Sequence, residues 1–213
     1  YKGFFEASGT GLPSFMKLPG ENSNNMMSSH EYQAHVKQMG ATNTETDAPV
    51  TFGKNIDVIG GGNTAMDSVR TAKRLGAERA MIIYRRSEEE MPARIEEVKH
   101  AKEEGIEFLT LHNPIEYIPD EEGRVKQVIL QKMELGEPDA SGRRRPVAIE
   151  GATETIDIDL AIVSVGVSPN PIVPSSIKGL EMGKWGTINV DDNMESSIPM
   201  IFAGGDIVRG GAT

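Results

Sequence analysis

The sequence contains no cysteine. These residues can therefore form no disulfide, and they can hold no iron–sulfur cluster and no thiol redox pair. Any redox chemistry has to come from a bound organic cofactor. The sequence also has no apolar run long enough to span a bilayer and no signal peptide at its start, so a cytoplasmic protein without a membrane partner is expected.

Basic residues are in short supply. The 213 residues include 22 Lys and Arg against 32 Asp and Glu, which gives a formal net charge of −10. Nucleic acids and anionic membranes require a basic surface, so neither is expected as a partner. This average leaves room for one small basic site that binds a phosphate. With 38% hydrophobic and 25% charged residues, the composition is that of a globular protein with one large domain or two small ones.

The first third of the chain is rich in loops. Turn signals occur at residues 9–13 and 18–20, and the spacing of Ser28 and Glu31 predicts a short capped helix that ends at Gly40. Residues 41–49 are polar and aperiodic, so we expect them to connect two domains. Both ends of the sequence, which starts without a methionine, are expected to cut through structure.

Strands and helices alternate after residue 50. Short apolar runs and helical segments that end at Gly76 and Gly105 predict a parallel sheet with right-handed crossovers. Pro92 falls inside the second helix, so the regular part of that helix should begin near it. The expected elements are strands 56–59, 80–84 and 106–111 and helices 64–75 and 88–104.

Residues 115–160 differ from this alternating pattern. The segments 125–130 and 155–158 flank a charged loop, which predicts an antiparallel β ribbon with Arg143-Arg144-Arg145 at a hairpin tip rather than in a phosphate site. The apolar run 161–165 is typical of a buried parallel strand. Two more strands are expected at 187–190 and 200–203. The predicted fold class is therefore α/β, a Rossmann-like parallel sheet with crossover helices and an added antiparallel ribbon.

A glycine-rich turn carries the strongest functional signal. Gly60-Gly61-Gly62-Asn63-Thr64-Ala65 fits the pattern G-x-G-x-x-A directly after a strand and at the start of a helix. Gly60 would permit the tight turn, Gly62 would let a pyrophosphate approach the backbone, and Ala65 would let the helix pack closely. Free N–H groups at the helix start favour phosphate binding. The alternative interpretation is a tight turn without a ligand.

The end of the second strand indicates which nucleotide binds. An NAD site usually places Asp or Glu there to hold the ribose 2′-hydroxyl group. This strand instead ends in Tyr84-Arg85-Arg86, and guanidinium groups can bind a 2′-phosphate through charge-assisted hydrogen bonds. NADPH is therefore the predicted nucleotide. The alternative is two solvated surface arginines.

Several motifs together resemble one family. Residues 59–105, with the glycine turn, Tyr84-Arg85-Arg86 and Glu90-Met91-Pro92-Ala93, are similar to the small (beta) subunit of NADPH-dependent glutamate synthase. The resemblance covers nearly the whole chain. Residues 11–21 resemble the family's first crossing between its domains, residues 165–170 its return crossing, and Phe202-Ala203-Gly204-Gly205-Asp206 its second flavin motif.

The resemblance implies a flavoprotein with two dinucleotide-binding domains. Residues 50–165 would form the NADPH-binding domain, and residues 1–49 and 166–213 would be two parts of an FAD domain. Gly166 and Pro169 would shape the pocket near the nicotinamide, and Gly205 and Asp206 would contact FAD. A hydride would pass from NADPH to FAD, and electrons would then leave through iron–sulfur clusters, which lie outside this sequence, to a large subunit that makes glutamate.

Two other functions stay open. One is a related subunit that reduces ferredoxin or polysulfide, and the other is a non-catalytic NADPH-binding module. Because cofactors carry out hydride transfer, no catalytic side chain is predicted. No metal site is predicted either, since His30 and His35 are five residues apart and lie on different helix faces.

Overall fold

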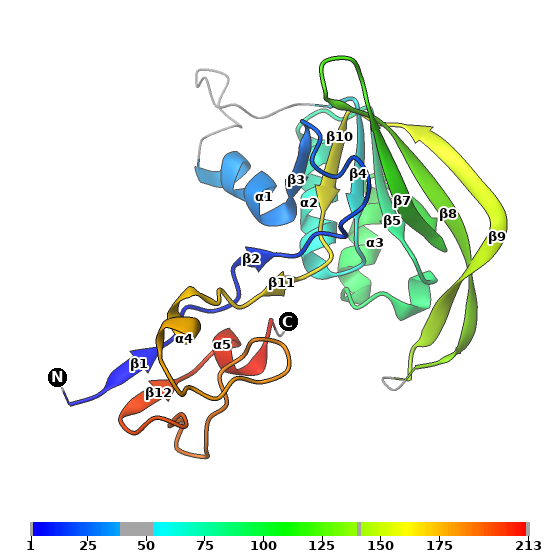
Figure 1. Ribbon diagram of the computed structural model, residues 1–213. Helices are drawn as coiled ribbons and strands as arrows, with labels where there is room; N and C mark the ends of the chain where they lie inside the picture. Colours follow the sequence, from blue (N-terminus) through cyan, green and yellow to red (C-terminus); the bar gives the residue numbers. More distant parts are fainter. Residues whose placement is uncertain (1, 39–52, 140–141, 212–213) are drawn as a thin grey trace. The chain divides into compact units, whose positions relative to one another are not determined.

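The computed structural model describes residues 2–38, 53–139 and 142–211. The chain divides into two compact units (Figure 1). The larger unit comprises residues 15–165, and the smaller one combines residues 1–14 with 166–213. Within the described residues, no helix is long and apolar enough to cross a membrane.

The larger unit is built around a parallel sheet. Its strand order is β3-β10-β4-β5-β6, and every neighbouring pair is parallel. The predicted alternation of strands and crossover helices is thereby confirmed. The five strands are β3 (Met26–Ser28), β4 (Asn55–Ile59), β5 (Arg79–Tyr84), β6 (Glu107–Thr110) and β10 (Leu160–Val163).

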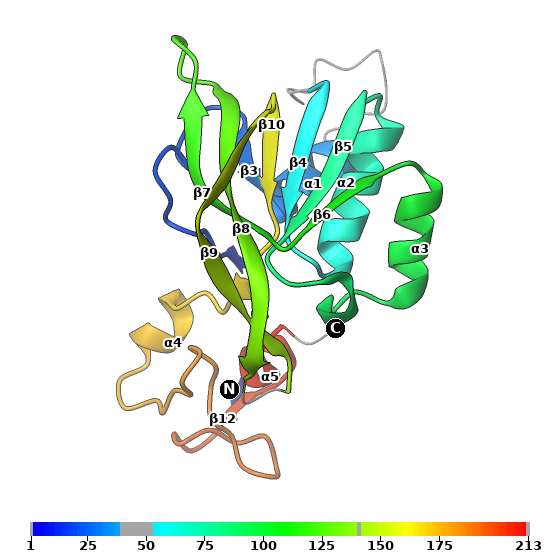
Figure 2. The same ribbon diagram turned by 90° about the vertical axis from the view of Figure 1, so that its right-hand side faces the viewer.

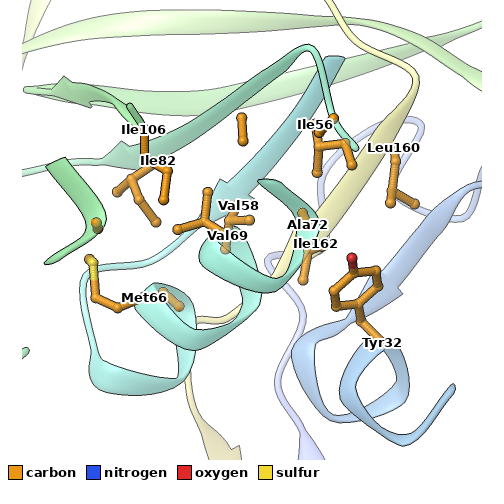
Figure 3. Close-up of a cluster of buried hydrophobic side chains, with 14 of the residues drawn as sticks. Tyr32, Ile56, Val58, Met66, Val69, Ala72, Ile82, Ile106, Leu160 and Ile162 are labelled. Atoms are coloured by element: carbon orange, nitrogen blue, oxygen red, sulfur yellow. The ribbon is translucent and has the colours of Figure 1, made fainter. Parts of the chain in front are cut away.

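Three helices cover one face of this sheet. They are α1 (Ser29–Gln38), α2 (Asn63–Arg74) and α3 (Ile95–Glu103). Met66 and Val69 of α2 are fully buried against Val58 and Ile82 of the central strands (Figure 3). The alternation of side chains along a strand sends Met81 and Ile83 to the opposite face. The strands are therefore apolar on both faces, as in buried parallel sheets.

A three-stranded antiparallel ribbon covers the second face (Figure 2). It consists of β7 (His112–Pro119), β8 (Val125–Pro138) and β9 (Arg144–Asp157), in that order. The predicted ribbon is confirmed, but its strands are longer than expected and β7 was not predicted. Pro114 and Pro119 hid β7 in the sequence, and both lie at register shifts in its pairing with β8.

The helix predicted over residues 88–104, with its regular part near Pro92, is divided into two elements. Glu88–Glu90 form a separate 3₁₀ turn, η1, closed by a capping box between Ser87 and Glu90. α3 starts only at Ile95, three residues beyond Pro92. The expected stop of α1 at Gly40 lies outside the described residues, whereas its predicted cap is present, since Glu31 N–H donates to Ser28 Oγ at 3.2 Å.

The smaller unit contains two short strand pairs. β1 (Phe4–Glu6) pairs in parallel with β12 (Ile201–Ala203), and β2 (Leu12–Pro13) pairs antiparallel with β11 (Val167–Ser168). Its short helices are α4 (Ile172–Ser176) and α5 (Asp206–Arg209).

The prediction of a strand over residues 187–190 is wrong. Ile188 and Val190 form only isolated bridges, with Met182 and Ser196, and no regular ladder continues on either side. The apolar pattern there reflects burial of Ile188 in the small core of this unit rather than a strand.

One predicted boundary differs from the observed division. The predicted NADPH-binding domain begins at residue 50, whereas the units separate after Ser14, inside the segment 11–21 that resembles the family's first crossing. Residues 15–38 belong to the larger unit because β3 pairs with β10 and α1 packs on the same face as α2. The chain returns to the smaller unit at Gly166. Assigning these units to NADPH and FAD stays a prediction.

Candidate functional site

The glycine turn lies at the carboxyl end of β4, the middle strand of the sheet. Ligands of open α/β sheets bind at this edge. Gly60 has φ +141°, and a Cβ atom there would lie 2.3 Å from the carbonyl oxygen of Ser164. The Gly60 N–H donates to the carbonyl oxygen of Ile83 at 3.1 Å. The protein's own backbone therefore requires glycine at this position.

Gly61 is required for a different reason. A Cβ atom at this position would lie 2.7 Å from the ring of Tyr84. That ring is fixed, because the Tyr84 hydroxyl group donates to the carbonyl oxygen of Glu90 at 2.9 Å. Gly61 also accepts a hydrogen bond from Ala93 N–H at 3.0 Å. The ring of Tyr84 thus packs against the backbone of the turn at Gly61.

Gly62 stands apart from the other two glycines. Its backbone has φ −91° and ψ 173°, which any residue can adopt, and a Cβ atom there would meet nothing within 4 Å. It is the N-cap of α2, and no side chain caps the helix. Neither packing nor backbone strain demands glycine at this position. The space beside Gly62 and the first N–H groups of α2 fit an anion that approaches the backbone closely.

The rest of the motif fixes the surroundings of the turn. Ala65 is fully buried, as expected for close packing of α2, and Thr64 is exposed. The Asn63 side chain accepts a hydrogen bond from Arg94 N–H at 2.9 Å. Together with the bond from Ala93 to Gly61, this contact ties the segment before α3 to the glycine turn. The sequence marked this segment only through its Glu-Met-Pro-Ala motif.

The two arginines after β5 have different environments. Arg85 is exposed, whereas Arg86 is only 7% exposed. Arg86 donates from Nε to the carbonyl oxygen of Arg144 and from Nη2 to Asp139 Oδ2, both at 2.8 Å. Of the predicted pair, Arg85 is therefore the residue with a solvent-facing guanidinium group.

Asp57 lies on β4, just before the glycine turn, and was not predicted from the sequence as a site residue. It is fully buried, and neither carboxylate oxygen has a hydrogen-bond partner. Burial holds the pKa of this carboxyl group well above its usual range. Burial also raises the pKa of Tyr117 on the ribbon, with a smaller contribution from Asp57. The strand that leads into the glycine turn therefore carries a buried carboxyl group without a hydrogen-bond partner for either oxygen.

The remaining predicted residues belong to the smaller unit. Gly166 is exposed with φ +118°, and Pro169 is buried. β12 leads into Gly204 and Gly205, and Gly205 has φ +75°. The exposed Asp206 carboxylate accepts a hydrogen bond from Thr10 Oγ1 at 3.3 Å. The structure thus brings the glycine turn and Tyr84 at the end of β5 together in the larger unit, whereas Gly166, Pro169, Gly205 and Asp206 belong to the smaller unit.

Solved structures share this architecture. FprA from Mycobacterium tuberculosis, in a complex with NADPH, superposes with a TM-score of 0.79 at 19% identity, over 100% of this chain and 59% of that one. The predicted fold class, that of the FAD/NAD(P)-binding reductases, is confirmed. A family model described as pyridine nucleotide-disulphide oxidoreductase matches residues 1–213. The chain belongs to that family.

Two relatives with known names are similar to this chain in sequence. The glutamate synthase [NADPH] small chain of Escherichia coli is 39% identical over 183 residues, 83% of this chain and 39% of the relative. The NADP(+)-dependent formate dehydrogenase subunit beta of Moorella thermoacetica is 44% identical over 167 residues, 78% of this chain and 23% of the relative. The predicted likeness to the glutamate synthase small-subunit family is confirmed. The chain spans well under half the length of either relative.

Proposed function

We propose that the larger unit binds NADPH at the glycine turn, as the NADPH-binding part of a flavin-dependent oxidoreductase. The observation that carries this proposal is Gly62, the one motif glycine that neither packing nor backbone conformation requires. A pyrophosphate beside it would accept hydrogen bonds from the start of α2. The match of the whole chain to a pyridine nucleotide oxidoreductase family supports the same nucleotide class.

Arg85 supplies the preference for NADPH over NADH. It follows the strand next to the glycine turn, where an NAD enzyme would carry a carboxylate. Its guanidinium group is exposed, so it can pair with a 2′-phosphate without first leaving a buried partner. The binding of NADPH by FprA and the names of both relatives agree with this preference.

The smaller unit provides part of a flavin site. Gly204 and Gly205 bring the chain tightly round to Asp206, whose exposed carboxylate could accept hydrogen bonds from the ribityl hydroxyl groups of FAD. Thr10 holds that carboxylate from the side. When bound, NADPH supplies a hydride and FAD accepts it. Gly166, without a side chain, would leave room near the nicotinamide, and Pro169 would support it.

The whole protein would pass these electrons on through iron–sulfur clusters to a partner subunit. A large glutamate synthase subunit is the first candidate for that partner, in view of the small-chain relative. A different acceptor is the second candidate, because the formate dehydrogenase subunit is at least as similar in sequence. Flavin content of the full-length protein would separate both from a non-catalytic NADPH-binding module.

Calorimetric titration tests nucleotide binding directly. One charge-assisted hydrogen bond contributes about 1.5–3 kcal/mol, so NADPH should bind at least about tenfold more tightly than NADH. Arg85→Ala should remove most of that difference and leave NADH binding unchanged. Arg74→Ala is the matched control, because it removes the same charge from the far end of α2. Equal affinities for both nucleotides in the unmutated protein would refute the assignment.

A further inference from the structure

Arg86 connects three parts of the larger unit. Its side chain binds Asp139 and the carbonyl oxygen of Arg144, which lie on the two arms of the β8–β9 hairpin. Its own carbonyl oxygen accepts a hydrogen bond from Leu111 N–H at 3.0 Å, just before β7. Leu111 in turn accepts one from Met133 N–H of β8 at 2.8 Å. The end of β5 is thereby fastened to the ribbon through side chain and backbone.

This environment does not suit a phosphate ligand. Arg86 is 7% exposed, and its guanidinium group already forms an ion pair with Asp139, whose side chain is 24% exposed. Turning Arg86 towards a ligand would break its hydrogen bonds to both Asp139 and the Arg144 carbonyl group in a part-buried site. Arg85, one residue earlier, carries no such cost because it is exposed.

We propose that Arg86 is a positioning residue that clamps the β8–β9 hairpin to the end of β5, and that Arg85 recognises the 2′-phosphate. The inference rests on the proposed NADPH site. By fastening the β8–β9 hairpin to the end of β5, the clamp holds the wall of the nucleotide site in place. Its loss should therefore weaken binding of NADPH and NADH alike, because both nucleotides share everything except the 2′-phosphate.

Nucleotide titrations of Arg86→Met and Arg85→Ala distinguish the two roles. For Arg86→Met we expect both dissociation constants to rise by about threefold or more, with the NADH-to-NADPH ratio kept within about twofold. For Arg85→Ala the ratio should fall at least about tenfold. A ratio in Arg86→Met that falls as far as in Arg85→Ala would overturn the proposal. Unchanged constants in a folded Arg86→Met protein would also overturn it, since Arg86 would then be merely structural.

Amide hydrogen exchange measures the clamp itself. The N–H groups of Asp139 and Gly142 are hydrogen-bonded within the hairpin, to the carbonyl oxygens of Arg143 and Asp139. Exchange at both should accelerate about fivefold or more in Arg86→Met and in Asp139→Asn. Arg124→Met is the matched control, because Arg124 pairs with Asp120 in the turn between β7 and β8. Unchanged exchange in the first two variants would refute the clamp.

Asp139→Asn keeps the test decisive if Arg86→Met does not fold. It breaks the ion pair from the hairpin side and leaves Arg86 in place, so the NADH-to-NADPH ratio should stay within about twofold of the unmutated value. An unmutated protein that binds neither nucleotide would refute the proposed function. The exchange measurements would still confirm or refute the clamp.

Discussion

Substitution of two neighbouring glycines should affect different properties: stability at Gly61 and nucleotide binding at Gly62. At Gly61, an added methyl group would lie 2.7 and 2.8 Å from two atoms of the Tyr84 ring. The ring is buried and held by its hydrogen bond to Glu90, so it cannot move aside freely. Overpacking of this kind costs about 1–3 kcal/mol, and loss of the tyrosine hydrogen bond adds about 1 kcal/mol. Gly61→Ala should therefore lower the free energy of unfolding by about 2–4 kcal/mol.

At Gly62 the same methyl group meets no protein atom. Alanine restricts the unfolded chain, which stabilises the fold slightly, but it is a poorer N-cap residue than glycine. These small effects oppose each other, so Gly62→Ala should change the unfolding free energy by no more than about 0.5 kcal/mol. Gly62→Val should fold as well, yet its branched side chain would occupy the place of the pyrophosphate. NADPH affinity should fall at least about a hundredfold, which is about 2.7 kcal/mol.

Urea denaturation and calorimetry measure the two effects separately. Unfolding should be followed by far-ultraviolet circular dichroism, because the single tryptophan, Trp185, lies in the smaller unit and would not report on the glycine turn. An unchanged dissociation constant in folded Gly62→Val would place the phosphate site elsewhere. Full stability of Gly61→Ala would show that the packing of Tyr84 does not limit the turn.

Two further predictions concern buried and paired carboxyl groups. The pKa of Asp57 is raised in the folded protein, so its contribution to stability is present below the ordinary value of 3.8 and is lost as pH rises towards the folded pKa. Asp57→Val should therefore increase the free energy of unfolding at neutral pH by about 1–3 kcal/mol. Urea denaturation measures this change. The pKa of Glu104 is lowered, chiefly by its hydrogen bond from Arg74, so its stabilising effect is present above 4.5 and is lost as pH falls through the folded pKa. Glu104→Gln should flatten the acid side of the stability curve, and an unchanged slope would contradict this assignment.

The parallel part of the fold was predictable because its signals are local. Each signal specifies structure within a few residues: the glycine turn, the helix stop at Gly76 and the apolar strands. The observed elements agree with these signals. The strand β3 was not predictable in this way. Met26–Ser28 is a short segment that pairs with β10, more than a hundred residues later in the chain. For that reason the sequence did not assign residues 15–38 to the sheet that contains the glycine turn.

Of the candidate site, the sequence identified the residue types better than their surroundings. It pointed to Gly60, Gly61 and Gly62 as a group, but only the structure separates the two that the protein itself requires from the one that it does not. Asp57 was missed because a lone acidic residue in an apolar strand has no distinctive pattern. Its burial depends on the ribbon that covers this face of the sheet, and that packing is non-local.

The sequence pattern itself distinguishes the two arginines that follow β5. Consecutive side chains on an extended backbone point to opposite sides. Tyr84 is buried, Arg85 is exposed and Arg86 is buried again, which follows that alternation past the end of the strand. The prediction that both arginines bind the 2′-phosphate is at odds with this alternation. What alternation alone could not supply is the partner for the inward arginine, because Asp139 lies 53 residues later, at the end of a ribbon strand that proved longer than predicted. The distinction between a phosphate ligand and a clamp therefore depends on the ribbon reaching the end of β5.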